Sequence, residues 1–363
     1  MKSTSMFAIA LGVAAMTVVL SQAQPPNPAP AAPKTGPGVQ AANDAREGDV
    51  LKTCMTPAPA RGGGPPRGGG GQGKGGPGRG AAPAAAPKEV TEIPGVVAAG
   101  QQWKEVWQVD GNNADGIIAT SDGGLLIAQN DNSAVVKLDK NGKASVAYMG
   151  LNTSGSMAMN SKGVLFVANR GLNPSIDELA PQRKVLANKY MGDPMDCIRS
   201  VLNDITADSK GGVYFTMGGV FYADPKGVVT RYGMNVNPNG IVLSPDEKHL
   251  YVTNGATLAA FDIAKDGSLS NQHEFAKWEG GGGDGSTFDA SGRLYVTASP
   301  GIQVISPDGK SLGAIPTPRG VISVAFSGPD RKTLYAVSRD NGQNKDWIIA
   351  LQMIAQGPKG RGK

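Results

Sequence analysis

The stretch GIVLSPDEKHLYVTNGATLAAFDIAKDGSLS, residues 240–270, contains three short runs rich in apolar and β-branched residues. The runs are separated by Ser-Pro-Asp-Glu-Lys and Asn-Gly, and the third ends in Lys-Asp-Gly. Pro, Asp, Asn and Gly favour tight reversals of the chain. Short runs of this composition between such turns predict consecutive antiparallel strands, and the stretch has no helical period.

The same pattern recurs along the chain from residue 89 onward. The middle strand returns at intervals of 37 to 48 residues, with its first matched positions at Leu125, Leu165, Val213, Leu250, Leu294 and Leu334. One strand precedes it and another follows it in each unit. Repeats of about 40 residues built from short strands are typical of β-propeller blades. We therefore predict an all-β, six-bladed β-propeller over residues 89–355, with a pair of β-sandwiches as the competing fold.

The last repeat has no obvious fourth strand. Residues 102–109, QWKEVWQV, precede the first repeat and have strand composition. A closed ring leaves no unpaired sheet edge. We expect this N-terminal strand to pair with the last blade and to close the ring.

The two ends of the chain differ from the repeats. Residues 1–23 have a lysine, an apolar run of about 15 residues and Ser-Gln-Ala, which predicts a signal peptide. A membrane anchor is the alternative, but the run is shorter than the roughly 20 residues that span a bilayer. Residues 24–88 are rich in Pro, Gly and Ala and predict a disordered linker, and residues 356–363 predict a basic flexible tail. We expect an exported protein, periplasmic or extracellular, with no integral membrane span after cleavage.

Charge and cysteine content exclude several classes of protein. The net charge is +5, but the basic residues lie mostly at the ends, and residues 89–355 carry about −4. This distribution argues against a nucleic-acid partner. The chain has two cysteines and two histidines, too few for a disulfide scaffold, a cysteine zinc site or histidine-rich chemistry. Cys54 and Cys197 could form one disulfide in an oxidising compartment, although their spacing does not decide it.

One position of the repeat predicts a metal site. The first strands of propeller blades surround the central axis, so equivalent residues converge there. Ten or eleven positions before each middle strand the chain has Asp115, Gly155, Asn203, Asn239, Asp284 and the Ile322–Ser323 region. Carboxylate and amide oxygens suit Ca²⁺ best, with Mg²⁺, Mn²⁺ or Zn²⁺ as alternatives.

We predict that Asp115, Asn203, Asn239 and Asp284 bind one divalent cation. The alternative is that Asp and Asn only bond their own backbone at turns, which we expect for Asp246. Asp204 should point the other way along its strand and have a structural role.

Three segments resemble a known family. Residues 218–271, 284–298 (DGSTFDASGRLYVTA) and 324–338 (VAFSGPDRKTLYAVS) are similar to the senescence marker protein/gluconolactonase/luciferin-regenerating enzyme family. The resemblance implies a regucalcin-like six-bladed propeller with one divalent cation in its channel. It places metal-binding positions on Asn239 and Asp284 and a further channel asparagine on Asn203.

Two positions depart from the family pattern. The first metal ligand is usually Glu and is Asp115 here. Members that act on sugar lactones often have Arg at the position of Val201, and Arg199 is a possible substitute. The loss of that arginine weakens the expectation of a polyhydroxylated sugar lactone.

The leading hypothesis is a metal-dependent hydrolase of lactones or related esters. A metal ion would polarise the carbonyl and activate water. The family resemblance implies that Asp284 is the candidate general base, and Asn203 is the candidate substrate-binding residue. The alternative is a catalytically inactive exported propeller that binds a ligand or a protein. The sequence leaves the oligomeric state open.

Overall fold

The computed structural model describes residues 39–57 and 89–360. The predicted signal peptide, residues 1–23, and most of the predicted linker lie outside the described residues. Within the described residues, no helix is long and apolar enough to cross a membrane.

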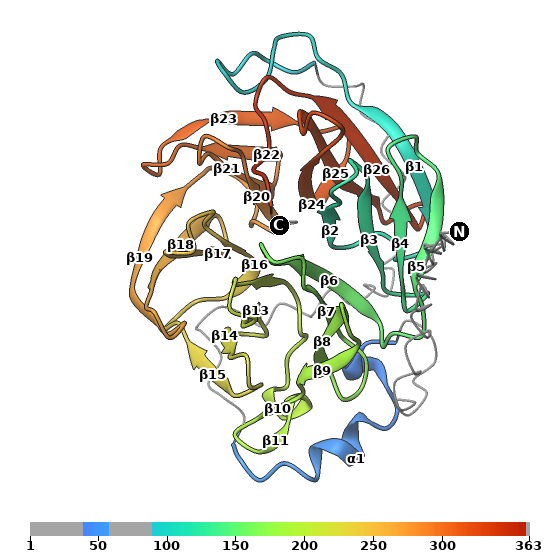
Figure 1. Cartoon of the computed structure of the whole chain (residues 1–363), viewed down its shortest axis with the longest axis vertical. Coiled ribbons are helices and arrows are strands. Elements are labelled where there is room, and N and C mark those ends of the chain that lie inside the picture. The colour runs from blue at the N-terminus through green and yellow to red at the C-terminus, as the bar shows by residue number, and fades with distance from the viewer. Residues whose placement is uncertain (1–38, 58–88, 361–363) are drawn as a thin grey trace, which may run out of the picture.

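The described residues form six four-stranded antiparallel sheets around a central axis, as predicted (Figure 1). The first three blades are β2 (Ile117–Ala119), β3 (Leu125–Gln129), β4 (Ala134–Leu138) and β5 (Ala144–Tyr148); β6 (Ser154–Met159), β7 (Leu165–Asn169), β8 (Ser175–Ala180) and β9 (Lys184–Ala187); and β12 (Ile205–Ala207), β13 (Val213–Thr216), β14 (Val220–Ala223) and β15 (Val229–Tyr232).

The last three blades are β16 (Pro238–Leu243), β17 (His249–Asn254), β18 (Thr257–Ile263) and β19 (Leu269–Lys277); β20 (Ser286–Phe288), β21 (Leu294–Ala298), β22 (Gly301–Ile305) and β23 (Ser311–Pro316); and β24 (Gly320–Ser327), β25 (Thr333–Asp340), β26 (Lys345–Gln352) and β1 (Lys104–Asp110).

The N-terminal strand closes the ring, as expected. Strand β1 pairs antiparallel with β26 from Lys104 opposite Ala350 to Asp110 opposite Lys345. Figure 1 shows β1 on the outside of the last blade, beside strands from the other end of the chain. Blade six therefore combines strands that are more than 200 residues apart in sequence.

The core consists of apolar layers between neighbouring blades. Between blades three and four, for example, Tyr214, Ile241, Leu250 and Phe261 are all buried in one cluster. The middle strand β3 is buried on both faces because a blade lies against each of them, whereas the outer strand β5 is mostly exposed. This burial explains why the middle strands are almost continuously apolar.

A segment of the predicted linker packs against the propeller. Residues 39–57, which we call the N-terminal strap, contain a 3-10 helix, η1 (Ala41–Asn43), and a short α-helix, α1 (Glu47–Leu51). Helix α1 lies next to a second 3-10 helix, η2 (Met195–Ile198), which follows the small hairpin β10 (Lys189–Tyr190) and β11 (Asp193–Pro194). A disulfide joins Cys54 to Cys197, with Cα atoms 5.7 Å apart. The strap is thus ordered within a segment whose composition predicts disorder.

Candidate functional site

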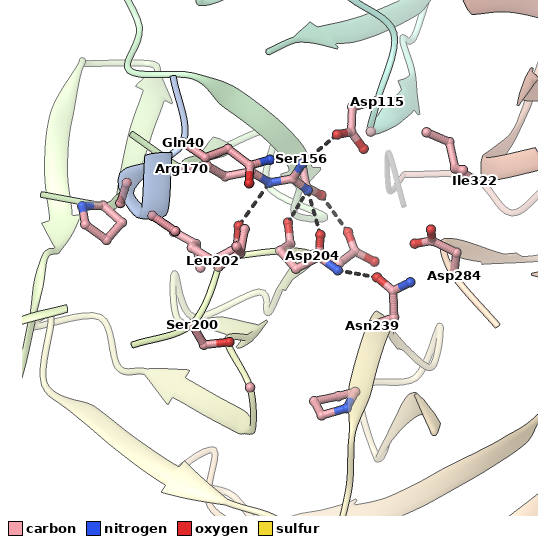
Figure 2. A pocket seen from close by; sticks show the side chains of 18 of the residues that line it. Gln40, Asp115, Ser156, Arg170, Ser200, Leu202, Asp204, Asn239, Asp284 and Ile322 are labelled. Carbon is pink, nitrogen blue, oxygen red and sulfur yellow. Dashed lines mark hydrogen bonds and ion pairs between the residues drawn. The ribbon is translucent and has the colours of Figure 1, made fainter. Parts of the chain in front are cut away.

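The four predicted metal ligands come together at the hub of the propeller. Asp115, Asn203, Asn239 and Asp284 all line one cavity of about 660 Å³. In Figure 2, Asp115, Asn239 and Asp284 lie around the same central space. The repeat phase therefore predicted their convergence correctly, while their role as metal ligands stays a prediction.

Close packing of the inner strands explains the glycine that follows three of these residues. A Cβ at Gly116 would lie 2.7 Å from the Cα of Ser156 on the next inner strand, and one at Gly285 would lie 2.9 Å from the carbonyl oxygen of Ile322. A Cβ at Gly240 would overlap a backbone carbonyl in the same way. The Asp-Gly and Asn-Gly pairs therefore mark points where neighbouring strands touch, immediately after the side chain that faces the channel.

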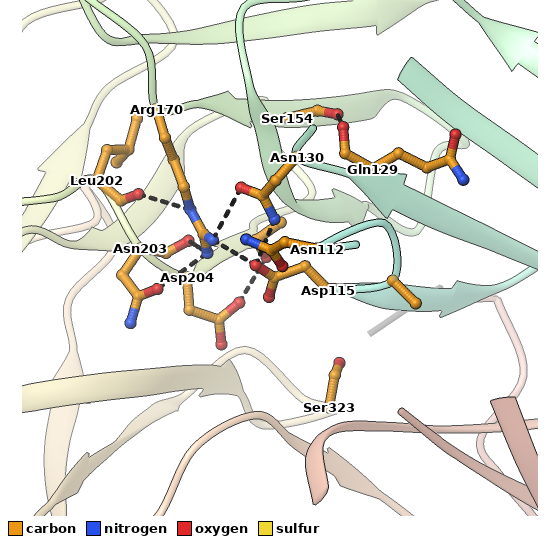
Figure 3. Close-up of polar contacts among 12 residues, drawn as sticks. Asn112, Asp115, Gln129, Asn130, Ser154, Arg170, Leu202, Asn203, Asp204 and Ser323 are labelled. Atoms are coloured by element: carbon orange, nitrogen blue, oxygen red, sulfur yellow. Dashed lines mark hydrogen bonds and ion pairs between the residues drawn. The ribbon is translucent and has the colours of Figure 1, made fainter. Parts of the chain in front are cut away.

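An arginine that the sequence analysis did not single out occupies one side of the hub. Arg170 directly follows β7, and its guanidinium has an acceptor for each of its five N–H groups (Figure 3). Its Nε donates to the carbonyl of Leu202 at 2.9 Å, and Nη1 donates to Asp115 Oδ2 at 2.5 Å and to Asn130 Oδ1 at 3.4 Å. Its Nη2 donates to the carbonyl and Oδ1 of Asn203 at 2.8 and 2.9 Å. Arg170 therefore fixes two of the four predicted ligands and has no remaining donor for a substrate.

Gly155 provides the space for this arginine. It lies at the channel position of blade two, where three other blades have Asp or Asn followed by Gly. A Cβ there would overlap the Nε, Cζ and Cδ atoms of Arg170. Blade two thus contributes a cationic side chain from the end of its second strand instead of an oxygen ligand from its first. The signal in the sequence was the lone glycine in the ring, together with an arginine after the next strand.

Asp115 and Asp284 have opposite electrostatic environments. Burial by itself would raise the pKa of Asp115, but Arg170 and Arg339, with a hydrogen bond from Asn130, hold it below the usual value. Burial raises the pKa of Asp284 to about 7, and the negative charges of Asp115 and Asp204 add to this effect. Within the described part of the chain, Asp284 forms no ion pair. Near neutral pH the hub therefore has one firmly ionised carboxylate and one that is ready to exchange a proton.

Asp204 has the structural contacts that we expected, but its side chain does not point away from the hub as predicted. Its carboxylate accepts hydrogen bonds from Ser156 Oγ at 2.6 Å and from the backbone N–H of Ile241 at 2.9 Å. These contacts join blade three to blades two and four. Asp204 also lines the cavity, so its charge acts on the hub as well.

The residues present fit a hard divalent cation better on one side of the hub than on the other. The donors are carboxylate and amide oxygens, and three carboxylates face two guanidinium groups, those of Arg170 and Arg339. Asn239 and Asp284 accept no hydrogen bond from either arginine in the described structure, whereas Asp115 and Asn203 are shared with Arg170. The Oδ1 of Asn239 accepts a hydrogen bond from Asn203 Nδ2 instead. No group of three His, Cys, Asp or Glu side chains suited to a metal occurs in residues 39–57 and 89–360, so the amide oxygens would be needed.

The fold and its hub define a class of protein: a six-bladed propeller with an oxygen-lined channel. The sequence model of one protein family, described as the SMP-30/Gluconolactonase/LRE-like region, matches residues 149–340, which is more than half of the chain. The protein belongs to this family, as the resemblance in the sequence implied.

Curated relatives include proteins named as lactonases. The chain is 26% identical to a gluconolactonase of Zymomonas mobilis over 68% of its own length and 79% of that protein. It is 27% identical to the lactonase drp35 of Staphylococcus saprophyticus over 64% of its length and 74% of that protein.

Solved structures show the same fold. A gluconolactonase of Xanthomonas campestris superposes with a TM-score of 0.62 at 21% identity, over 73% of this chain and 95% of that one. A calcium-binding regucalcin of Agrobacterium tumefaciens superposes with a TM-score of 0.57 at 17% identity, over 70% and 94%. At these identities the likeness establishes the fold alone.

Proposed function

We propose that this protein is an exported hydrolase of lactones or related esters that requires a divalent cation. Ca²⁺ is the ion that we propose. The observation that carries the proposal is the convergence of Asp115, Asn203, Asn239 and Asp284 in one hub cavity. The names of the curated relatives support a small lactone as substrate. The cavity, at about 660 Å³, has the size of a small-molecule site.

Each side chain of the hub has a distinct part in the proposed reaction. Asn203, Asn239 and Asp284 would hold the cation, with Asp115 at its edge, and the bound ion would polarise the carbonyl and lower the pKa of water. Asp284 would also accept a proton from the attacking water. Arg170 acts as a positioning residue, because all its N–H groups hold Asp115, Asn203 and their neighbours in place.

Export is part of the proposal. The pattern of residues 1–23 supports it, and so does the disulfide between Cys54 and Cys197. Disulfides persist in the periplasm and outside the cell, whereas cytosolic thiols are kept reduced.

The test combines metal analysis with a lactone hydrolysis screen. The purified protein should contain a divalent cation, and EDTA should abolish turnover that Ca²⁺ then restores. Asp284→Ala should lose metal and activity together. Asp246→Ala, a change in a surface turn where the carboxylate accepts from Ser244 Oγ at 2.7 Å, should keep both. If Asp284→Ala and Asp246→Ala both retained full metal content, the hub would not be the metal site.

A propeller that binds a ligand without hydrolysing it is the second candidate. The observation that favours it is that the guanidinium of Arg170 donates hydrogen bonds to Asp115 Oδ2 and Asn203 Oδ1, two oxygens that a cation would otherwise use. Bound metal without turnover on a broad panel of lactones would support this candidate over the enzyme.

A further inference from the structure

The N-terminal strap is fastened to the propeller at both of its ends. At its start, the backbone N–H of Ala41 donates to the carbonyl of Arg170 at 3.0 Å, and Thr153 Oγ1 donates to the carbonyl of Val39 at 3.1 Å. At its end, the Cys54–Cys197 disulfide holds the strap covalently. The start of the strap is therefore hydrogen-bonded to the backbone of Arg170, the residue whose guanidinium contacts Asp115 and Asn203.

A carboxylate reinforces the second fastening. Asp193 Oδ2 accepts hydrogen bonds from the backbone N–H groups of Met55 and Thr56, at 3.0 and 2.7 Å, and from Thr56 Oγ1 at 2.5 Å. The strap is thus held by two hydrogen bonds at its start and by a covalent bond with three hydrogen bonds at its end.

The strap supplies part of the cavity wall. Five of its residues line the cavity, and three of these are apolar: Gln40, Ala41, Ala42, Glu47 and Leu51. Figure 2 shows the strap at the edge of the site, with Gln40 beside Arg170. Apolar residues of the propeller line the same cavity: Pro174, Val201, Leu202 and Pro238. The cavity thus has apolar surface from both the strap and blades two to four, and the polar side chains of Glu47, Asp196 and Arg199 line it as well.

We propose that the strap is a substrate-specificity element that binds an uncharged apolar substituent carried by the lactone ring. The inference rests on the proposed lactone hydrolysis and adds to it the class of substrate. The ring of the substrate would lie at the hub beside Asp284, and its substituent would extend toward Leu51 and Val201. The side chains of Val201 and Leu51 offer no hydrogen bond to sugar hydroxyls, whereas burying each methylene of an alkyl chain against them is favourable.

The experiment compares two lactones that differ only in the substituent. γ-Butyrolactone has none, and γ-nonalactone carries a five-carbon chain on the same ring. The full chain, wild type and Leu51→Ala, is assayed with both, and KM and kcat are measured separately. We expect Leu51→Ala to raise KM for γ-nonalactone about tenfold and to leave kcat unchanged. The reason is that the truncated side chain no longer covers about one to two methylenes of the substrate's alkyl chain. KM for γ-butyrolactone should stay within about twofold.

Two further variants keep the result interpretable. Lys52→Ala, next in sequence but with its side chain 78% exposed, should leave both substrates unaffected. The double variant Cys54→Ser, Cys197→Ser releases the end of the strap and should raise KM for γ-nonalactone at least as much as Leu51→Ala does. If this double variant does not fold, the KM values of Leu51→Ala alone test the proposal.

The two possible failures are distinct. Hydrolysis of both lactones with an unchanged ratio of KM values in Leu51→Ala would overturn the role of the strap and leave the proposed function standing. A wild-type protein that hydrolyses neither lactone, nor any other lactone of the screen, would overturn the proposed function and the inference with it.

Discussion

Gly155 and Arg170 together decide the character of the hub. We predict that Gly155→Ala destabilises the protein by about 3 kcal/mol, because the new Cβ displaces a guanidinium that is 6% exposed and leaves Asp115 without its partner. The free energy of unfolding in urea measures this loss. Gly320→Ala is the matched control, since a Cβ there meets no atom within 4 Å. Equal stability of Gly155→Ala and Gly320→Ala would show that the channel accommodates Arg170 elsewhere.

Asp284 makes the free energy of unfolding depend on pH. Its pKa in the folded state is raised from 3.8 to about 7, so its contribution to stability is present below its unfolded pKa and is lost as the pH rises through 7. We predict that Asp284→Asn, measured in EDTA, raises the free energy of unfolding by up to about 4 kcal/mol at pH 8. Near pH 4 the variant and the wild type should have the same stability.

Asp246 provides the control of opposite sign. Burial by itself would raise its pKa, but hydrogen bonds from Ser244 and Lys248 lower it, so its contribution is present at neutral pH and is lost as the pH falls. Asp246→Asn should therefore lower the melting temperature slightly at pH 8. If Asp284→Asn also lowered the melting temperature at pH 8, the excess negative charge at the hub would be compensated by a group that we have not identified.

At the level of elements, the strands were predictable, whereas the strap was predicted only as part of a disordered linker with one possible disulfide, Cys54–Cys197. The middle strands are apolar on both faces because each blade is covered by two neighbours, and this leaves a strong repeating signal in the sequence. The strap has five helical residues in α1, none of them buried, within a segment rich in Pro and Gly. Its order depends on Cys197 and Asp193, which are more than 130 residues away in sequence. Local composition cannot predict such an anchor.

At the level of the whole molecule, ring closure depends on β1. Blades six and one share an apolar layer that includes Ile117, Ile127, Val337 and Ile348, and β1 is the strand that comes from the opposite end of the chain. We predict that replacing residues 104–110 by Gly and Ser lowers the free energy of unfolding by about 2 kcal/mol or more and promotes self-association, because it exposes the edge of β26. Urea unfolding and size-exclusion chromatography with light scattering would measure both effects.

Replacing the outer strand β5 (Ala144–Tyr148) in the same way tests whether closure is the cause. This strand also covers the edge of a blade, but it is continuous in sequence with that blade and does not join the two ends of the chain. The β5 replacement should therefore cost less stability. If the two replacements cost the same, β1 would be only an edge cover and the ring would be held by the contacts between blades.

The sequence by itself determined the number of blades, the closing strand and the convergence of Asp115, Asn203, Asn239 and Asp284, because a repeat turns a shared phase into a shared position in space. The tertiary structure decided what those side chains meet there. Arg170 comes from a different position of the repeat and fits at the hub because Gly155 has no side chain. The strap is held beside the cavity by the Cys54–Cys197 disulfide. Both are contacts between residues distant in sequence, and such contacts follow from packing in three dimensions and not from local pattern.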